Sequence, residues 1–255
     1  FNGLRQRGIA LSEQVQAQIN AGPAAIEPIK ADLQVTLATV DGEVATPHSK
    51  VFSTLAWSTV LGFGAGVGFL IGANVLGSTY NAFFGGLFSI ALVLVVLPYL
   101  AFGRLAVGDL SDTDARMMLL GQAAFTGLAL GSTFNHLYLA EPMAFLTPAV
   151  AALAFAYGSG ALGTDRQKLL GAAVGGSFVA QIVVGGVVGS MNGAYFFTAL
   201  LHAAALFVLL QLIFKNVSAA SANTHVYMLY YIVGYALVKI IAYGALGSTA
   251  PPAEN

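Results

Sequence analysis

The chain has 255 residues, of which 57% are hydrophobic and 8% are charged, and its formal net charge is −1 at pH 7. A soluble domain carries about 25% charged residues, so this composition excludes an ordinary soluble fold and indicates a membrane protein. The near-zero net charge gives no general attraction to nucleic acid. Cysteine is absent, which excludes disulfide bonds, thiol catalysis and cysteine-ligated metal centres.

Residues 1–47 form a polar amino-terminal arm. Apolar residues spaced through 9–19 predict a short, weakly amphipathic helix. The alternation in residues 34–44 predicts a β-hairpin that turns at Asp41 and Gly42. Neither element could bury a core alone, so we interpret the arm as a flexible or surface-lying tail, or as a segment docked on a partner.

Residues 48–247 form the main domain, and residues 248–255 form a short polar tail. The main domain contains apolar segments long enough to cross a hydrocarbon core of about 30 Å, which takes about 20 helical residues. The segments are residues 51–76, 82–102, 117–139, 144–162, 169–188, 195–214 and 225–246. The sequence therefore predicts an all-α, polytopic membrane protein with seven transmembrane helices.

The lysine and arginine residues between these segments all fall on one side if the segments cross in alternation. They are Lys50, Arg104, Arg116, Arg166, Lys168 and Lys215. Basic residues are retained on the side from which a chain inserts, so this side is the cytosol, or the matrix of a mitochondrion. Lys239 lies inside the last segment and is expected to extend toward a membrane surface, unless that segment does not cross fully.

Glycines spaced four residues apart predict where the helices pack closely, because small residues let two backbones approach each other. The glycines that we assign to helix packing are Gly64, Gly68, Gly72, Gly127, Gly131, Gly185 and Gly189. The glycine-rich run 62–68 has neither the spacing nor the lysine of a phosphate-binding loop. A compact helical bundle therefore explains these glycines best.

Carboxylates are rare between residues 51 and 246. They are Asp109, Asp112, Asp114, Glu141 and Asp165, and the segmentation places all of them in loops or at helix ends. Cation transport by a carboxylate relay is therefore disfavoured. The run 109–116 lacks the glycine and the terminal glutamate of a calcium loop, so Ser111 or Thr113 is expected to cap a helix instead.

The histidines do not form a recognisable metal site. No HxxxH or HxxE spacing occurs, and His136 and His202 are expected to form structural hydrogen bonds. No nucleophile is spaced to meet a general base. We therefore expect no cofactor, no bound metal and no enzymatic activity.

Two stretches carry a resemblance to a known family. The run 48–56, HSKVFSTLA, and the run 116–131, RMMLLGQAAFTGLALG, resemble the first and third helices of the Bax inhibitor family, the transmembrane Bax inhibitor motif proteins. Residues 141–142 and 146–149 stand where that family enters its fourth helix. The likeness covers about residues 48–246.

The resemblance implies a seven-helix fold whose last helix is central, and a pH-sensitive calcium leak or anti-apoptotic activity. In that family the leak depends on acidic residues, and each of their positions is substituted here. The corresponding residues are Asn135, Val208 or Leu209, Met228 and Ile232. The resemblance therefore implies the fold without the residues of the leak.

These observations favour a structural or accessory subunit of a membrane complex, with the lipid bilayer and other membrane-protein subunits as partners. The chain begins at Phe1, and Arg5 and Arg7 precede its first acid, so we expect the mitochondrial inner membrane, with the endoplasmic reticulum or another endomembrane as the alternative. A second hypothesis is a calcium-leak channel that works through hydroxyl groups, Asn135 and His202. An intramembrane enzyme is the least favoured of the three.

Overall fold

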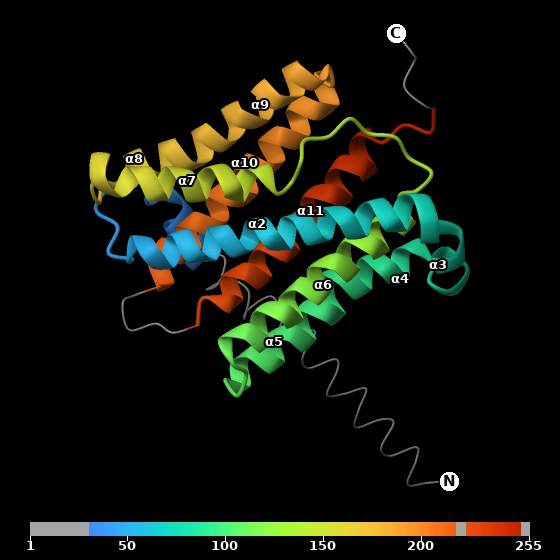
Figure 1. Cartoon of the computed structure of the whole chain (residues 1–255), viewed down its shortest axis with the longest axis horizontal. Coiled ribbons are helices and arrows are strands. Elements are labelled where there is room, and N and C mark those ends of the chain that lie inside the picture. Colours follow the sequence, from blue (N-terminus) through green and yellow to red (C-terminus); the bar gives the residue numbers. More distant parts are fainter. Residues whose placement is uncertain (1–30, 218–222, 251–255) are drawn as a thin grey trace, which may run out of the picture. The chain divides into compact units, whose positions relative to one another are not determined.

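The structure is a computed structural model that describes residues 31–217 and 223–250 (Figure 1). The chain forms two compact units, residues 1–40 and residues 41–255. In the first unit, residues 31–38 are helical. Thr36 and Thr39 donate their hydroxyl protons to the carbonyl oxygens four residues earlier, at 2.7 and 2.8 Å. The helix expected within residues 9–19 lies outside the described residues.

The predicted hairpin over residues 34–44 is wrong. Its first half is helical, because a few alternating residues are a weak signal without a partner strand. Gly42 does form a turn, with φ +99°. The chain after it pairs with the loop before α8: Val44 N–H donates to the Thr164 carbonyl at 2.8 Å. Residues 41–47 therefore belong to the second unit.

The second unit consists of helices, several of which contain a π-helical turn. In chain order they are α2 (His48–Ile71), η1 (Gly72–Leu76), α3 (Gly77–Phe83), α4 (Gly86–Ala91), η2 (Leu92–Val96), α5 (Leu97–Val107), α6 (Asp112–Thr133), α7 (Leu146–Ala161), α8 (Arg166–Leu170), η3 (Gly171–Gly175), α9 (Gly176–Val188), α10 (Gly193–Asn216) and α11 (His225–Leu246). Each π turn joins the helices on either side into one continuous rod, such as His48–Phe83.

Short polar residues fix where several helices begin. The side chains of Ser111, Asp165 and Asn192 accept hydrogen bonds from backbone N–H groups three residues later, at the starts of α6, α8 and α10. Gly108 and Gly189 end α5 and α9 with φ of +73° and +72°, a conformation that glycine adopts without a steric penalty. The prediction of a helix cap at Ser111 is confirmed.

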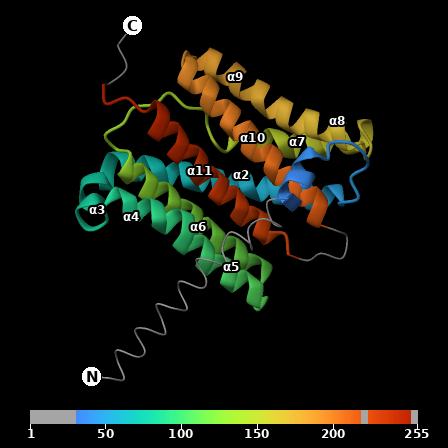
Figure 2. The same ribbon diagram turned by 180° about the vertical axis from the view of Figure 1, so that it is seen from behind.

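The core of this unit has two parts that share α2 and α11. One lies among α2, α5, α6 and α11, and the other lies among the start of α2, α7, α8 and α10. Figure 2 shows α11 between α10 and the group of α5 and α6, and α11 contacts α2 as well. α2 and α11 thus connect the two halves of the bundle.

Among the described residues, five helices are long and apolar enough to cross a membrane, by length and composition. They are His48–Phe83, Gly86–Val107, Arg166–Val188, Gly193–Asn216 and His225–Leu246. The prediction of seven such helices is wrong by this measure. α6 is long enough but carries Asp112, Asp114 and Arg116 in its first turns, and α7 has only a short apolar stretch, Leu146–Gly158.

Candidate functional site

The helix-packing glycines meet most closely where α2 crosses α6. A Cβ atom built on Gly68 or Gly72 would overlap a main-chain carbonyl oxygen of α6, and one built on Gly127 or Gly131 would overlap a main-chain carbonyl oxygen of α2. The four oxygens belong to Ala124, Leu128, Ala65 and Phe69, respectively. The two backbones are therefore in direct contact, and we call this interface the α2–α6 seam.

The other predicted packing glycines differ in their surroundings. A Cβ on Gly64 would meet the side chain of Leu120 on α6, and one on Gly185 would overlap the ring of Tyr195 on α10. Gly189 has no atom within 4 Å of such a Cβ. Its assignment to helix packing is wrong, since its positive φ shows that it serves to end α9.

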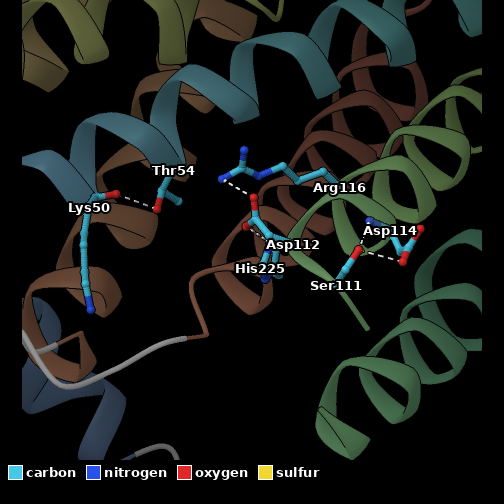
Figure 3. Close-up of polar contacts among 7 residues, drawn as sticks. All are labelled: Lys50, Thr54, Ser111, Asp112, Asp114, Arg116 and His225. Carbon is cyan, nitrogen blue, oxygen red and sulfur yellow. Dashed lines mark hydrogen bonds and ion pairs between the residues drawn. The ribbon is translucent and has the colours of Figure 1, made fainter. Parts of the chain in front are cut away.

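Most of the charged residues that the structure describes in the second unit lie at one end of the bundle, which we call the polar end. The starts of α2, α6, α8 and α11 meet the ends of α5, α7 and α10 there. In Figure 3, Asp112 lies between Arg116 and His225, at 2.9 and 3.0 Å. Arg116 also lies over the Trp57 ring, 4.7 Å from its centroid. This cluster joins the starts of α6 and α11 to α2.

A second cluster at the polar end holds the loop before α2. Thr46 donates its hydroxyl proton to the Val217 carbonyl at 2.8 Å. Arg166 is buried, donates to the side-chain oxygen of Gln211, and lies 5.5 Å from the centroid of Phe214. These contacts fix residues 41–47 against α8 and α10 and leave Asp41 and Glu43 exposed.

The structure changes the titration of Asp165, one of the charged residues of this end. Its side chain accepts the backbone N–H of Lys168 at 3.0 Å and pairs with the Lys168 ammonium at 3.1 Å. The backbone hydrogen bond, and then the side-chain contact with Lys168, lower the pKa of the Asp165 carboxyl below its ordinary value. The carboxylate therefore remains charged as a helix cap in moderately acidic solution.

The opposite end of the bundle contains a buried ion pair. Lys239, on α11, is 4% exposed and pairs with Glu141 from the loop between α6 and α7. The Lys239 ammonium lies 4.3 Å from the ring centroid of Phe69, and the Tyr243 hydroxyl donates to the same carboxylate oxygen at 3.3 Å. Carboxylate, ring face and hydroxyl together replace the water that a buried ammonium loses.

The expectation that Lys239 extends to a membrane surface is wrong, because its side chain is buried in the bundle and pairs with Glu141. Lys239 lies seven residues from the end of α11, about 10 Å along the helix. Its partner could have been predicted from charge alone. Once the other charged residues between 51 and 246 are assigned to the polar end, Lys239 and Glu141 are the one base and the one acid of this range that are left over.

A pocket of about 280 Å³ opens beside this pair, between α2 and the loop that carries Glu141. Its wall is mainly apolar and includes Phe63, Leu70 and Met143. The second carboxylate oxygen of Glu141 is buried and has no hydrogen-bond partner among the described residues. The pair therefore combines one satisfied oxygen with one that is still able to accept a hydrogen bond.

A polar cluster without charge lies among α7, α9 and α10. Gln181 donates to the Thr147 hydroxyl, and Tyr195 donates to the Gln181 carbonyl at 2.8 Å. His202 is 5% exposed, and its Nδ1 lies 2.9 Å from the Thr198 carbonyl. This contact agrees with the structural hydrogen bond that the sequence predicts for His202.

The residues at the family leak-site positions do not come together as a site. Asn135 is exposed in the turn after α6, and Val208 and Leu209 lie on α10. Met228 and Ile232 are buried in the apolar core on α11. Within the described part of the chain, no group of three or more His, Cys, Asp or Glu residues could hold a metal ion.

Comparison with known families identifies the chain. The model of a family described as Interactor of ZYG-11 matches residues 2–249. The chain belongs to the Interactor of ZYG-11 family. No curated protein and no solved structure matches it.

Membership of the Interactor of ZYG-11 family overturns the resemblance to the Bax inhibitor family. The two stretches that carried that resemblance lie on α2 and α6 and consist largely of apolar and small residues. Any closely packed pair of membrane helices requires such residues, so they did not distinguish one family from another. The calcium-leak and apoptosis functions rested on that resemblance and are therefore wrong as well. No finding supports a location in the mitochondrial inner membrane or a role as an accessory subunit there.

Proposed function

We propose that this chain is an integral membrane protein that acts by binding a protein partner, and that the partner is ZYG-11, the protein in the family description. The observation that carries the proposal is the family match, which extends over residues 2–249. The match includes the helices as well as the arm, which supports a common role for the whole chain.

The outer surfaces of the bundle support the membrane location. The rod Gly86–Val107 is scarcely buried, and its outward side chains are large and apolar, with Leu87 83% and Tyr99 76% exposed. The rod Arg166–Val188 is similar, with Val187 83% exposed. Soluble proteins rarely expose apolar surface on this scale, and lipid would cover it.

The polar end supports the binding role. Besides its internal ion pairs it presents exposed charged side chains, among them Asp41, Asp109 and Lys168. Charged groups at the rim of an interface steer encounter and fix register. Among the described residues, the charges at the opposite end are those of the Lys239–Glu141 pair. We therefore assign the partner-binding face to the polar end.

The absence of catalysis is part of the proposal. The buried polar side chains bond mainly to carbonyl oxygens and to each other, as Ser177 does with Thr147 and Ala173. That pattern is typical of helix packing in a low-dielectric interior.

Two experiments test the proposal separately. After alkaline carbonate extraction of cell membranes, the chain should remain in the pellet and be released by detergent; release by carbonate would refute the membrane location. In detergent, the purified chain should bind purified ZYG-11 in a pull-down assay. If ZYG-11 binds equally well to an unrelated membrane protein with five helices, the specific interaction is refuted.

A matched pair of variants locates the binding face. Asp109→Lys changes an exposed charge at the polar end, whereas His136→Lys adds a charge after α6, toward the other end. We expect Asp109→Lys to weaken ZYG-11 binding about tenfold, the order of a lost interfacial charge contact, and His136→Lys to leave it unchanged. The reverse result would move the interface to the opposite end.

A further inference from the structure

The interface between α10 and α11 contains an open groove. It has a volume of about 360 Å³ and is lined almost entirely by apolar atoms. Ala204 and Leu237, on α10 and α11, lie at its exposed side. If these helices span a membrane, as we have proposed, the groove opens toward hydrocarbon.

A smaller cavity of about 30 Å³ lies directly behind the groove. Its wall adds four residues with polar groups: Thr147, His202, Tyr231 and Tyr235. The two tyrosine hydroxyls donate to the carbonyl oxygens of Ala144 and Ala65. Five residues line both spaces and so form the boundary between them: Ala205, Leu209, Tyr230, Gly234 and Val238. The groove therefore leads inward to a buried cavity that has polar side chains in its wall.

Gly234 keeps this passage open. A Cβ atom built on it would lie 3.8 Å from the Ala205 Cβ, which is an ordinary contact distance. The backbones of α10 and α11 are thus farther apart than the backbones at the α2–α6 seam. The missing side chain at Gly234 leaves space that neither helix fills.

His202, at the inner end of this passage, has one ring nitrogen that is available to accept a hydrogen bond. His202 Nδ1 faces the Thr198 carbonyl oxygen, and a carbonyl oxygen only accepts, so in the neutral ring the proton is on Nδ1. Nε2 then carries a lone pair, and it is buried without a partner among the described residues. A buried acceptor without a donor is costly, so a ligand that donates one hydrogen bond would be stabilised here.

We propose that the groove binds a lipid alcohol, which is a hydrocarbon chain that ends in a single hydroxyl group. This hydroxyl donates a hydrogen bond to His202 Nε2. The cavity of about 30 Å³ has room for a group of about the size of one water molecule, and a phosphate headgroup is larger. His202 lies nine residues into α10, about 14 Å from its start. A single hydroxyl can be buried at that depth, whereas a charged headgroup stays at the interface.

The test uses the purified full chain in detergent micelles and a photoactivatable, alkyne-tagged hexadecanol. Labelling should saturate, and unlabelled hexadecanol should compete about three- to tenfold better than hexadecyl methyl ether, which is the range for one hydrogen bond. The ether has the same body but no proton to donate. Equal competition by the two would show that His202 does not accept from the ligand and would overturn the proposal.

Substitutions locate the site. Ala204→Phe fills the groove from an exposed position on α10 and should reduce labelling at least about fivefold. Val179→Phe places the same side chain at an exposed position on α9 outside the groove and should leave labelling unchanged. His202→Phe should remove the preference for the alcohol over the ether. Each protein must elute as a monodisperse peak, and Leu237→Trp replaces Ala204→Phe if that variant does not.

The remaining outcomes also decide the question. If the groove variant that is tested does not reduce labelling, or if the probe becomes attached outside α10 and α11, the groove is not the site and the proposal is overturned. A cross-link to a second protein chain would show that a helix, and not a lipid, occupies the groove. Because the alcohol is delivered in micelles, this result is independent of the carbonate extraction that tests the membrane location.

Discussion

The α2–α6 seam and the α10–α11 interface both contain glycine, but glycine serves opposite purposes in them. In the seam, the space above Gly68 and Gly127 is filled by the backbone of the other helix. At Gly234, the nearest atom to a built Cβ is an alanine methyl group at ordinary distance, and a groove of about 360 Å³ lies alongside. The same residue type thus closes one interface and opens the other.

The difference follows from what surrounds each glycine. The seam contains glycines on both helices at intervals of four residues, so each backbone fits into the space that the other leaves. α10 presents alanine and leucine opposite Gly234. One glycine facing side chains leaves a gap, whereas reciprocal glycines make a close contact.

The largest effect is expected from Gly127→Val, which breaks the seam. The new side chain would overlap the Ala65 carbonyl, and because a main-chain atom cannot rotate away, the cost should reach or exceed about 3 kcal/mol. Loss of the folded protein from size-exclusion chromatography in detergent is the expected result. Gly121→Val, on the same helix with no atom within 4 Å, is the control and should remain folded; equal loss in both would mean that the seam is not responsible.

The next largest effect should come from Lys239→Met, which tests a contact between α11 and α2. Lys239 of α11 lies on Phe69 of α2, so it joins the seam to the last helix. Removing the ammonium leaves the Glu141 carboxylate buried and unpaired, which costs roughly 3–5 kcal/mol. Thermal unfolding in detergent measures the change.

Two further variants separate the ion pair from simple packing. Adding Glu141→Gln to Lys239→Met should restore part of the loss, since no buried charge then remains. Lys168→Met breaks the exposed ion pair with Asp165, in which the Lys168 side chain is 63% exposed and the Asp165 side chain 41%. This variant should lower the free energy of unfolding by less than about 1 kcal/mol. A double variant as unstable as the sum of the single variants would contradict the account of the ion pair.

The sequence predicted the features that depend on local spacing. The bounds of α11 were predicted as residues 225–246, and the glycines of the seam were recognised from their interval of four residues. The third segment, predicted to reach residue 139, ends at Thr133, because apolar residues continue past the turn where the helix stops. Hydrophobicity alone does not show where a loop begins.

The contacts that make up the candidate sites were harder to predict, because they join distant residues. Glu141 and Lys239 are 98 positions apart, and the loop that carries Glu141 has no periodic pattern to place it. The groove depends on how far α10 and α11 stand apart at Gly234, which no local pattern encodes. The short alternation in residues 34–44 failed for a related reason: without a neighbouring strand, it did not outweigh helix formation.

A smaller effect is expected at the start of α6, one of the two helices of the seam. Ser111 accepts the Asp114 backbone N–H at 3.1 Å, so Ser111→Ala should lower the free energy of unfolding by about 1 kcal/mol. Thr113 lies within the first turn and does not cap the helix, so Thr113→Ala should change the free energy of unfolding by less than half as much. Thermal unfolding of both variants in one detergent decides which residue caps the helix; a larger loss for Thr113→Ala would overturn the assignment.

The smallest change, and the most direct test of the comparison, is a single methyl group at each interface. Gly234→Ala adds a Cβ at ordinary contact distance and replaces glycine inside a helix, so it should stabilise the protein by up to about 1 kcal/mol. Gly68→Ala makes the same substitution in α2 and gains the same helix propensity, but its methyl group overlaps the Ala124 carbonyl. It should therefore destabilise the protein. Unfolding midpoints that shift in the same direction would show that the two interfaces are equally close and that the groove is not a lasting feature of the fold.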